Sequence, residues 1–277
     1  MYPEIFHLSF LHTYGLLVAV AFLTGLWMAS RLAARAGLNV EAVSNLGIYC
    51  ALAAIGGAKL MMFLVDMGYY AQHPREILSI YTLQAGGVFY GGLVAALGVA
   101  WWYMRKTRLP LLRTADVFAP AIALGHGIGR LGCFAAGCCW GVECHLPWAV
   151  TFTSPAANHL VGVPLGKPLH PTQLYEAVAE FAIFGLLYRR IVKPRPAGSI
   201  IALYLMLYSA ARFTVEFFRY HEQGNLWGGP LDTSQWISAA LFALGAAYFT
   251  RRTSGRQGEL LTRRHGDAEK FKRKNEK

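Results

Sequence analysis

Residues 114–136 read TADVFAPAIALGHGIGRLGCFAA, a stretch in which apolar and small residues far outnumber charged ones. A helix of about 20 such residues crosses the hydrocarbon core of a bilayer, which is roughly 30 Å thick. Gly125, Gly129 and Gly132 recur at helical spacing and would let a neighbouring helix approach closely. The stretch therefore predicts a transmembrane helix.

Comparable runs lie on both sides of this stretch, at roughly 11–31, 46–66, 87–104, 173–192, 198–218 and 234–251. The composition agrees, because 55% of the 277 residues are hydrophobic and only 15% are charged. A water-soluble domain carries about a quarter charged residues. We therefore expect an all-α integral membrane protein with about seven transmembrane helices.

The basic residues alternate along the chain. Of the 26 Lys and Arg residues, 20 follow the first, third, fifth and seventh predicted spans. Basic loops stay on the cytoplasmic side, so the N-terminus is predicted outside and the C-terminus in the cytoplasm. We expect a membrane domain over 1–251, with an outer loop at about 137–171, and a basic cytoplasmic tail over 252–277. Topology and anionic lipid explain the net charge of +11, so no nucleic-acid partner is expected.

The sixth predicted span carries three charged residues on one helical face, because Arg212, Glu216 and Arg219 follow an i, i+4, i+7 spacing. Charges inside a membrane are costly and point to function unless they pair. Two arginines against one glutamate leave a spare positive charge, and a guanidinium suits a phosphate. The alternative is an ion network that only orients the helices.

Near the outer end of the 114–136 stretch, His126, Arg130 and Cys133 fall on one stripe. Arg130 would be a second arginine for an anion. In the alternative interpretation its side chain only extends to the outer membrane interface.

Polar residues also begin the first, third and fifth predicted spans, namely Tyr14, Tyr90, Gln173, Glu176 and Glu180. The orientation of the spans places all of these groups at a similar depth, in the outer part of the membrane. Taken alone, Tyr90 would be an ordinary interfacial anchor. Together the groups predict a polar intramembrane cavity that binds an anionic lipid headgroup.

Four of the five cysteines cluster within twelve residues: Cys133, Cys138, Cys139 and Cys144, with Cys50 apart. This is not the paired C-x2-C spacing of a typical zinc site. The pattern favours structural roles or a disulfide in the outer loop, where the compartment is oxidising. Metal binding is the less favoured alternative, and neither a metal site nor a cofactor is assigned.

Four motifs in this order resemble the prolipoprotein diacylglyceryl transferase family. They are GGVFYGG at 86–92, GRLGCF at 129–134 with Gly141 closing it, HPTQLYE at 170–176, and RFTVEFFR at 212–219. The resemblance implies seven spans in a bacterial inner membrane. It also implies transfer of a diacylglyceryl group from phosphatidylglycerol to the cysteine thiol of a prolipoprotein signal peptide, with release of glycerol phosphate.

The resemblance further implies that Arg130 binds the lipid headgroup, that Arg212 is a second essential arginine, and that Glu216 orients Arg212. The complete set of predicted lipid-binding residues is Arg130, Arg212, Arg219, Tyr14, Gln173, Tyr175 and Glu176. The predicted catalytic residues are Arg130, Arg212, Tyr90, Glu216 and His126.

This sequence departs from the family pattern at several positions. Tyr90 stands where histidine is usual, and a phenol with a pKa near 10 is a poor base at neutral pH. The other departures are Lys59 for arginine, Cys133 and Ala136 for asparagine, and Cys138 for glutamate. His126 is a possible substitute base. There are two alternatives: a divergent relative that transfers a phospholipid-derived group to another acceptor, and a non-enzymatic protein that binds or transports anionic lipid. The sequence shows no clear internal repeat of the kind that is typical of transporters.

Overall fold

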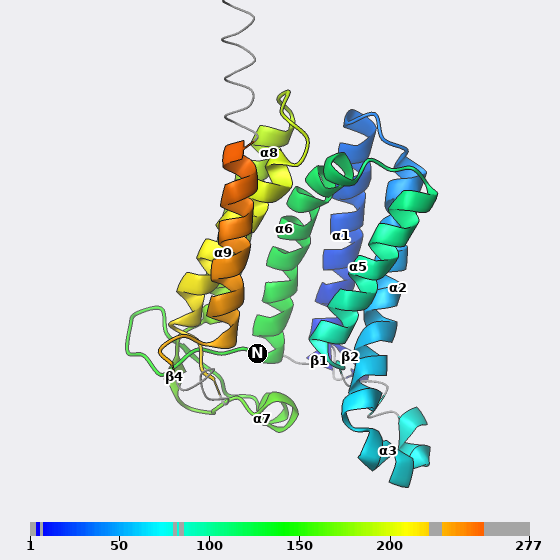
Figure 1. Cartoon of the computed structure of the whole chain (residues 1–277). Helices are drawn as coiled ribbons and strands as arrows, with labels where there is room; N and C mark the ends of the chain where they lie inside the picture. Colours follow the sequence, from blue (N-terminus) through cyan, green and yellow to red (C-terminus); the bar gives the residue numbers. More distant parts are fainter. Residues whose placement is uncertain (1–3, 6–7, 80–81, 83–85, 222–228, 252–277) are drawn as a thin grey trace, which may run out of the picture. The chain divides into compact units, whose positions relative to one another are not determined.

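The computed structural model describes residues 4–5, 8–79, 82, 86–221 and 229–251. Seven long helices lie within these residues, and each overlaps one of the predicted spans (Figure 1). They are α1 (Thr13–Arg35), α2 (Val40–Val65), α5 (Phe89–Lys106), α6 (Leu111–Ala136), α8 (Thr172–Ile191), α9 (Ser199–Glu216) and a helix over 233–251.

The first predicted span begins two residues early, because residues 11–12 belong to a hairpin of β1 (Glu4–Ile5) and β2 (Leu8–His12). Four helices, α1, α2, α6 and α9, are long and apolar enough to cross a membrane. The protein is thus a helical membrane protein. The number of spans and the sides on which the termini lie stay predictions, and the predicted tail at 252–277 lies outside the described residues.

The chain divides into two compact units, 29–114 and the remainder. Within 29–114, α2 packs on α5 through glycines. A Cβ atom placed on Gly57 or on Gly91 would lie 2.5 Å from the other glycine's carbonyl oxygen, so the two backbones are in contact. Helix α3 (Met67–Gln72) and the 3-10 turn η1 (Pro74–Leu78) follow α2. The Lys59 ammonium donates to the Thr82 carbonyl, 2.5 Å away.

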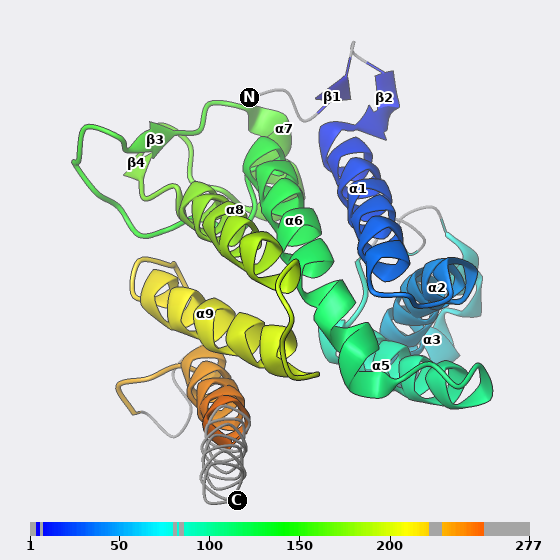
Figure 2. The ribbon, with the colours of Figure 1, turned by 90° about the horizontal axis from the view of Figure 1, so that it is seen from above.

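The other unit contains α6, α8 and α9, which lie side by side (Figure 2). Ala119 and Ala123 of α6 pack against Leu187 of α8 and Ile200 of α9, and all four are buried. Small alanine side chains let α6 approach its neighbours closely, so polar groups on the three helices can meet.

Asp116 of α6 fixes where α9 begins. Its carboxylate accepts hydrogen bonds from the backbone N–H groups of Gly198, Ile200 and Ile201, at 2.7, 3.0 and 2.9 Å. These donors lie in the first turn of a helix, where N–H groups have no partner within the helix. Gly198 has φ of +85°, which glycine adopts without steric cost. The end of α9 is thereby set relative to α6.

The predicted outer loop contains short ordered pieces, namely β3 (Val150–Thr151), α7 (Pro155–Val161) and β4 (Pro168–Leu169). It has a small core of Phe152, Ala157, Val163 and Leu169. Backbone hydrogen bonds also join the loop to the end of α9, from Val142 N–H to the Phe218 carbonyl at 2.9 Å. The loop therefore holds the segment that carries Arg219.

Candidate active site

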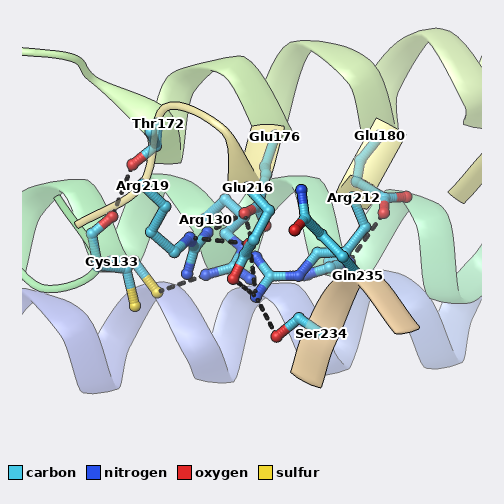
Figure 3. Close-up of polar contacts among 12 residues, drawn as sticks. Arg130, Cys133, Thr172, Glu176, Glu180, Arg212, Glu216, Arg219, Ser234 and Gln235 are labelled. Atoms are coloured by element: carbon cyan, nitrogen blue, oxygen red, sulfur yellow. Dashed lines mark hydrogen bonds and ion pairs between the residues drawn. The ribbon is translucent and has the colours of Figure 1, made fainter. Parts of the chain in front are cut away.

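Three arginines converge on one carboxylate at one end of the α6, α8 and α9 bundle (Figure 3). Glu176, in the first turns of α8 and only 4% exposed, forms ion pairs with Arg130, Arg212 and Arg219. The Arg212 Nη1 atom donates to Glu176 Oε1 at 2.7 Å. A carboxylate buried to this extent is stable only because its charge is matched by such partners.

A second buried carboxylate, Glu216, completes the group. Its Oε2 atom lies 3.0 Å from Arg212 Nη2 and 3.4 Å from Arg219 Nε. We refer to Arg130, Glu176, Arg212, Glu216 and Arg219 as the arginine cluster. Three guanidinium groups and two carboxylates leave one net positive charge in it, which suits a singly charged phosphodiester.

Helical spacing explains two of the five residues in the arginine cluster. Arg212 and Glu216 are one turn apart in α9, as the sequence predicts, and Arg219 follows directly after the helix ends. Arg130 comes from the last turns of α6 and Glu176 from the first turns of α8. Only the packing of three helices brings these side chains to one end of the bundle.

His126 and Glu180 form a second polar contact farther along α6 and α8. The His126 Nδ1 atom lies 2.9 Å from Glu180 Oε1, and Glu180 is 2% exposed. A carboxylate in this position fixes the orientation of the imidazole ring. The geometry is compatible with the predicted base role of His126, which stays a prediction.

An apolar cavity of about 360 Å³ runs between α1 and α6. Its walls are almost entirely apolar, and His126 is the one polar side chain among the residues that line it. Gly129 directly precedes Arg130 in α6. The cavity therefore reaches the turn of α6 that carries Arg130. It is lined by Val18, Ala21, Phe22, Gly25, Leu26, Phe118, Ala121, Ile122, Gly125, His126 and Gly129.

Two of the predicted lipid-binding residues bond within the protein. Gln173 is fully buried and donates from Nε2 to the Cys138 carbonyl at 2.6 Å. The Tyr175 hydroxyl accepts from Trp148 Nε1 at 2.8 Å and lies 3.0 Å from His170 Nδ1. Both side chains position the outer loop.

Tyr14 and Tyr90 lie in different compact units. A Cβ atom on Gly132 would lie 3.5 Å from Tyr14 Cδ2, so Tyr14 covers the last turns of α6. Tyr90 lies in the first turn of α5, in the unit over 29–114, and is 54% exposed. The predicted catalytic role of Tyr90 stays a prediction.

All five cysteines lie in the described residues, and all are free thiols, so the structure contains none of the disulfides weighed from the sequence. The sulfur atoms of Cys133, Cys138 and Cys139 lie within 4.8 Å of one another. Hydrogen bonding by the Cys133 and Cys138 thiols holds the pKa of Cys139 well below its usual range, and nearby Arg219 and Arg130 act in the same direction.

His221 and Asp232 form an ion pair beside Glu216 that the sequence did not predict. His221 Nε2 lies 3.1 Å from Asp232 Oδ2 and 3.5 Å from Glu216 Oε1. Asp232 directly precedes the 233–251 helix, and its Oδ1 atom accepts from the Gln235 N–H at 2.8 Å. The sequence alone can indicate that Asp232 caps the start of a helix. It cannot indicate that Asp232 contacts His221.

Comparison with known proteins decides the family. Residues 3–251 match the family model described as prolipoprotein diacylglyceryl transferase. The chain belongs to this family. A phosphatidylglycerol–prolipoprotein diacylglyceryl transferase of Clostridium tetani is 34% identical over 254 residues, which cover 90% of this chain and 97% of its own. One of Bordetella avium is 36% identical over 258 residues, covering 89% and 93% respectively.

All four motifs that carry the resemblance lie inside the stretch matched to the prolipoprotein diacylglyceryl transferase family. Two of them, at 129–134 and 212–219, supply all three arginines of the arginine cluster, and a third supplies Glu176. The family assignment and the geometry therefore point to the same end of the helical bundle.

Proposed function

We propose that this membrane transferase moves the diacylglyceryl group of phosphatidylglycerol to the cysteine thiol of a prolipoprotein signal peptide. The observation that carries the proposal is the convergence of Arg130, Arg212 and Arg219 on Glu176 in an almost fully buried position. The names of the relatives support the same substrates.

The charge of the arginine cluster fits the reaction. A phosphodiester carries one negative charge, and the arginine cluster carries one net positive charge. The acceptor sulfur forms a bond to the glyceryl carbon while the bond from that carbon to the phosphate oxygen breaks. Negative charge grows on the departing glycerol phosphate, where Arg130 and Arg212 would stabilise it most strongly in a site of low dielectric constant.

The apolar cavity supplies a place for the hydrocarbon part of the lipid. One acyl chain would lie along α1 and α6, with the ester and phosphate groups near His126 and Gly129. Because its walls are as apolar as the lipid tails of the bilayer, an acyl chain would enter the cavity at little cost, while the arginine cluster orients the phosphate.

The protein would cross a bacterial inner membrane seven times, with its N-terminus outside. Seven long helices and the basic residues after alternate helices support this topology. Single cysteines placed in a variant that lacks the native ones would test it. A membrane-impermeant thiol reagent should label position 145 in intact cells, and position 108 only after lysis.

The reaction itself is tested with purified protein, phosphatidylglycerol and a peptide that contains a lipobox cysteine. We expect the peptide mass to rise by one diacylglyceryl group, with release of one glycerol phosphate per peptide. Arg130→Ala should abolish both products, whereas Lys167→Ala, on the exposed outer loop, should not. Lipid binding without any product would refute the proposed reaction.

A further inference from the structure

Three thiols meet where α6 ends. Cys133 lies in the last turn of α6, and Cys138 and Cys139 lie just beyond it. Their sulfur atoms lie within 4.8 Å of one another, and all three residues are partly buried. We refer to these residues as the thiol cluster. Three cysteines in such a small volume are a set of ligands for a thiophilic metal ion.

The backbone holds the thiol cluster in an unusual conformation. Cys139 has φ of +59°, a left-handed value that residues other than glycine rarely adopt. Gly137 has φ of +81° in the same turn. A strained residue of this kind persists only where its surroundings impose it, and such residues gather at functional sites.

Two side chains of α8 impose this conformation. The Thr172 hydroxyl donates to the Cys139 carbonyl at 2.7 Å, and Gln173 Nε2 donates to the Cys138 carbonyl at 2.6 Å. Both side chains are fully buried. The two cysteines are thus fixed by a different helix from the one that carries Cys133, so the sulfur atoms are arranged before any ligand arrives.

We propose that Cys133, Cys138 and Cys139 bind a zinc ion whose fourth coordination position takes the thiol of the acceptor cysteine. Zinc–sulfur bonds of about 2.3 Å place the sulfur atoms of a tetrahedral site roughly 3.8 Å apart, which small rotations of these side chains would reach. Among the described residues, no other cysteine, histidine or carboxylate joins this group. Three protein ligands with one open position are typical of catalytic zinc.

The position of the thiol cluster suits this role. Arg130 Nη1 lies 4.0 Å from Cys133 Sγ and belongs to the arginine cluster (Figure 3). A sulfur bound beside Cys133 would therefore lie close to the guanidinium that, in the proposed function, holds the phosphate. Three thiolates and Zn²⁺ carry one net negative charge, which Arg130 partly balances.

The inference rests on the proposed function and adds the step that prepares the nucleophile. The acceptor thiol loses its proton to solvent on binding, because a thiol coordinated to zinc is deprotonated. Its sulfur then forms the bond to the glyceryl carbon, and the electron pair of the broken carbon–oxygen bond leaves with glycerol phosphate. The buried carboxylates near the site are engaged, since Glu176 and Glu216 pair with arginines.

The first test measures metal in the full-length protein purified from zinc-supplemented cells. We expect roughly one zinc per chain, and a loss of at least about tenfold in zinc content in Cys139→Ser and Cys133→Ser. Cys50→Ser, in α2, is the matched control and should keep its zinc. Size-exclusion profiles and lipid binding should show that every variant is folded.

The second test uses cobalt in place of zinc, because Co²⁺ reports its ligands by absorption. Thiolate charge-transfer bands should appear in the wild-type protein and be lost in Cys139→Ser. A lipobox peptide should intensify these bands by adding a fourth sulfur, whereas the same peptide with serine in place of cysteine should not. Bands that do not change when the lipobox peptide is added would refute the proposal that the metal has an open coordination position for the acceptor thiol.

Other outcomes also contradict the inference. A disulfide between two of the three cysteines, or bound copper in a protein that rejects zinc, would overturn the zinc site. Full transfer by metal-free protein would overturn it while leaving the proposed function intact. Bound zinc and peptide-dependent cobalt spectra without transfer would support the metal site and refute the proposed reaction.

Discussion

Glu176 of α8 and Arg212 of α9 are joined by a hydrogen-bonded ion pair of 2.7 Å, and both side chains are largely buried. The same carboxylate also meets Arg130 and Arg219. Within the arginine cluster, Glu176 is the carboxylate that pairs with all three arginines. Without it, Arg130 would lose this ion pair, and Arg212 and Arg219 would share Glu216.

Glu176→Gln should impair both stability and transfer. Removal of one partner from a buried ion pair costs about 3–5 kcal/mol, and the arginines would lose their common anchor. We expect a lower melting temperature in detergent and at least about a hundredfold loss of kcat/KM, the size of effect seen when charge-stabilising groups are lost.

Glu143→Gln is the control for this change. Glu143 forms an exposed ion pair of 3.7 Å with Lys167 on the outer loop, and exposed pairs contribute little to stability. Its melting temperature and activity should match the wild type. Equal melting temperatures and equal activities of Glu176→Gln and Glu143→Gln would show that Glu176 does not organise the arginine cluster.

Gly129→Leu should obstruct the apolar cavity without disturbing the fold. A Cβ atom on Gly129 would meet nothing within 4 Å, and the residue lines the cavity. We expect KM for long-chain phosphatidylglycerol to rise more than KM for a short-chain form. Titration of both lipids in the transfer assay measures this.

Gly185→Leu provides the comparison, because Gly185 of α8 is equally open and lies outside the residues that line the cavity. It should leave both KM values unchanged. A similar rise in the two variants would mean that the added leucine acts through the membrane or through helix packing.

His126→Asn tests the predicted base. If His126 accepts a proton during transfer, its loss should lower kcat by about 10²-fold or more, with little change in lipid binding. Glu180→Gln should then also lower kcat, because Glu180 lies 2.9 Å from the imidazole and fixes its orientation. Full activity of His126→Asn would remove the residue from the mechanism.

Asp116→Ala should destabilise α9 without direct effect on chemistry. Three backbone N–H groups lose their acceptor, and unsatisfied buried donors cost about 1–3 kcal/mol each. We expect a clear fall in melting temperature and near-normal activity at low temperature. Loss of activity with unchanged stability would contradict this role.

The sequence predicted the seven long helices because hydrophobic length is a property of each segment alone. The one-turn spacing of Arg212 and Glu216 likewise follows from helical geometry within one segment. The same reasoning was wrong for Arg219, which lies beyond the end of α9 and pairs with Gly141 in a β-bridge. Tyr90 belongs to the other compact unit, 29–114, and its predicted catalytic role stays a prediction.

Only the tertiary structure shows which polar side chains on different helices contact one another. Three sets of contacts join different helices. Glu176 pairs with three arginines, and Asp116 caps a helix more than 80 residues away in the sequence. Thr172 and Gln173 of α8 fix the thiol cluster at the end of α6. Such contacts depend on how each helix is rotated and how closely it approaches its neighbours. Hydropathy and spacing leave these undetermined, because they describe one helix at a time.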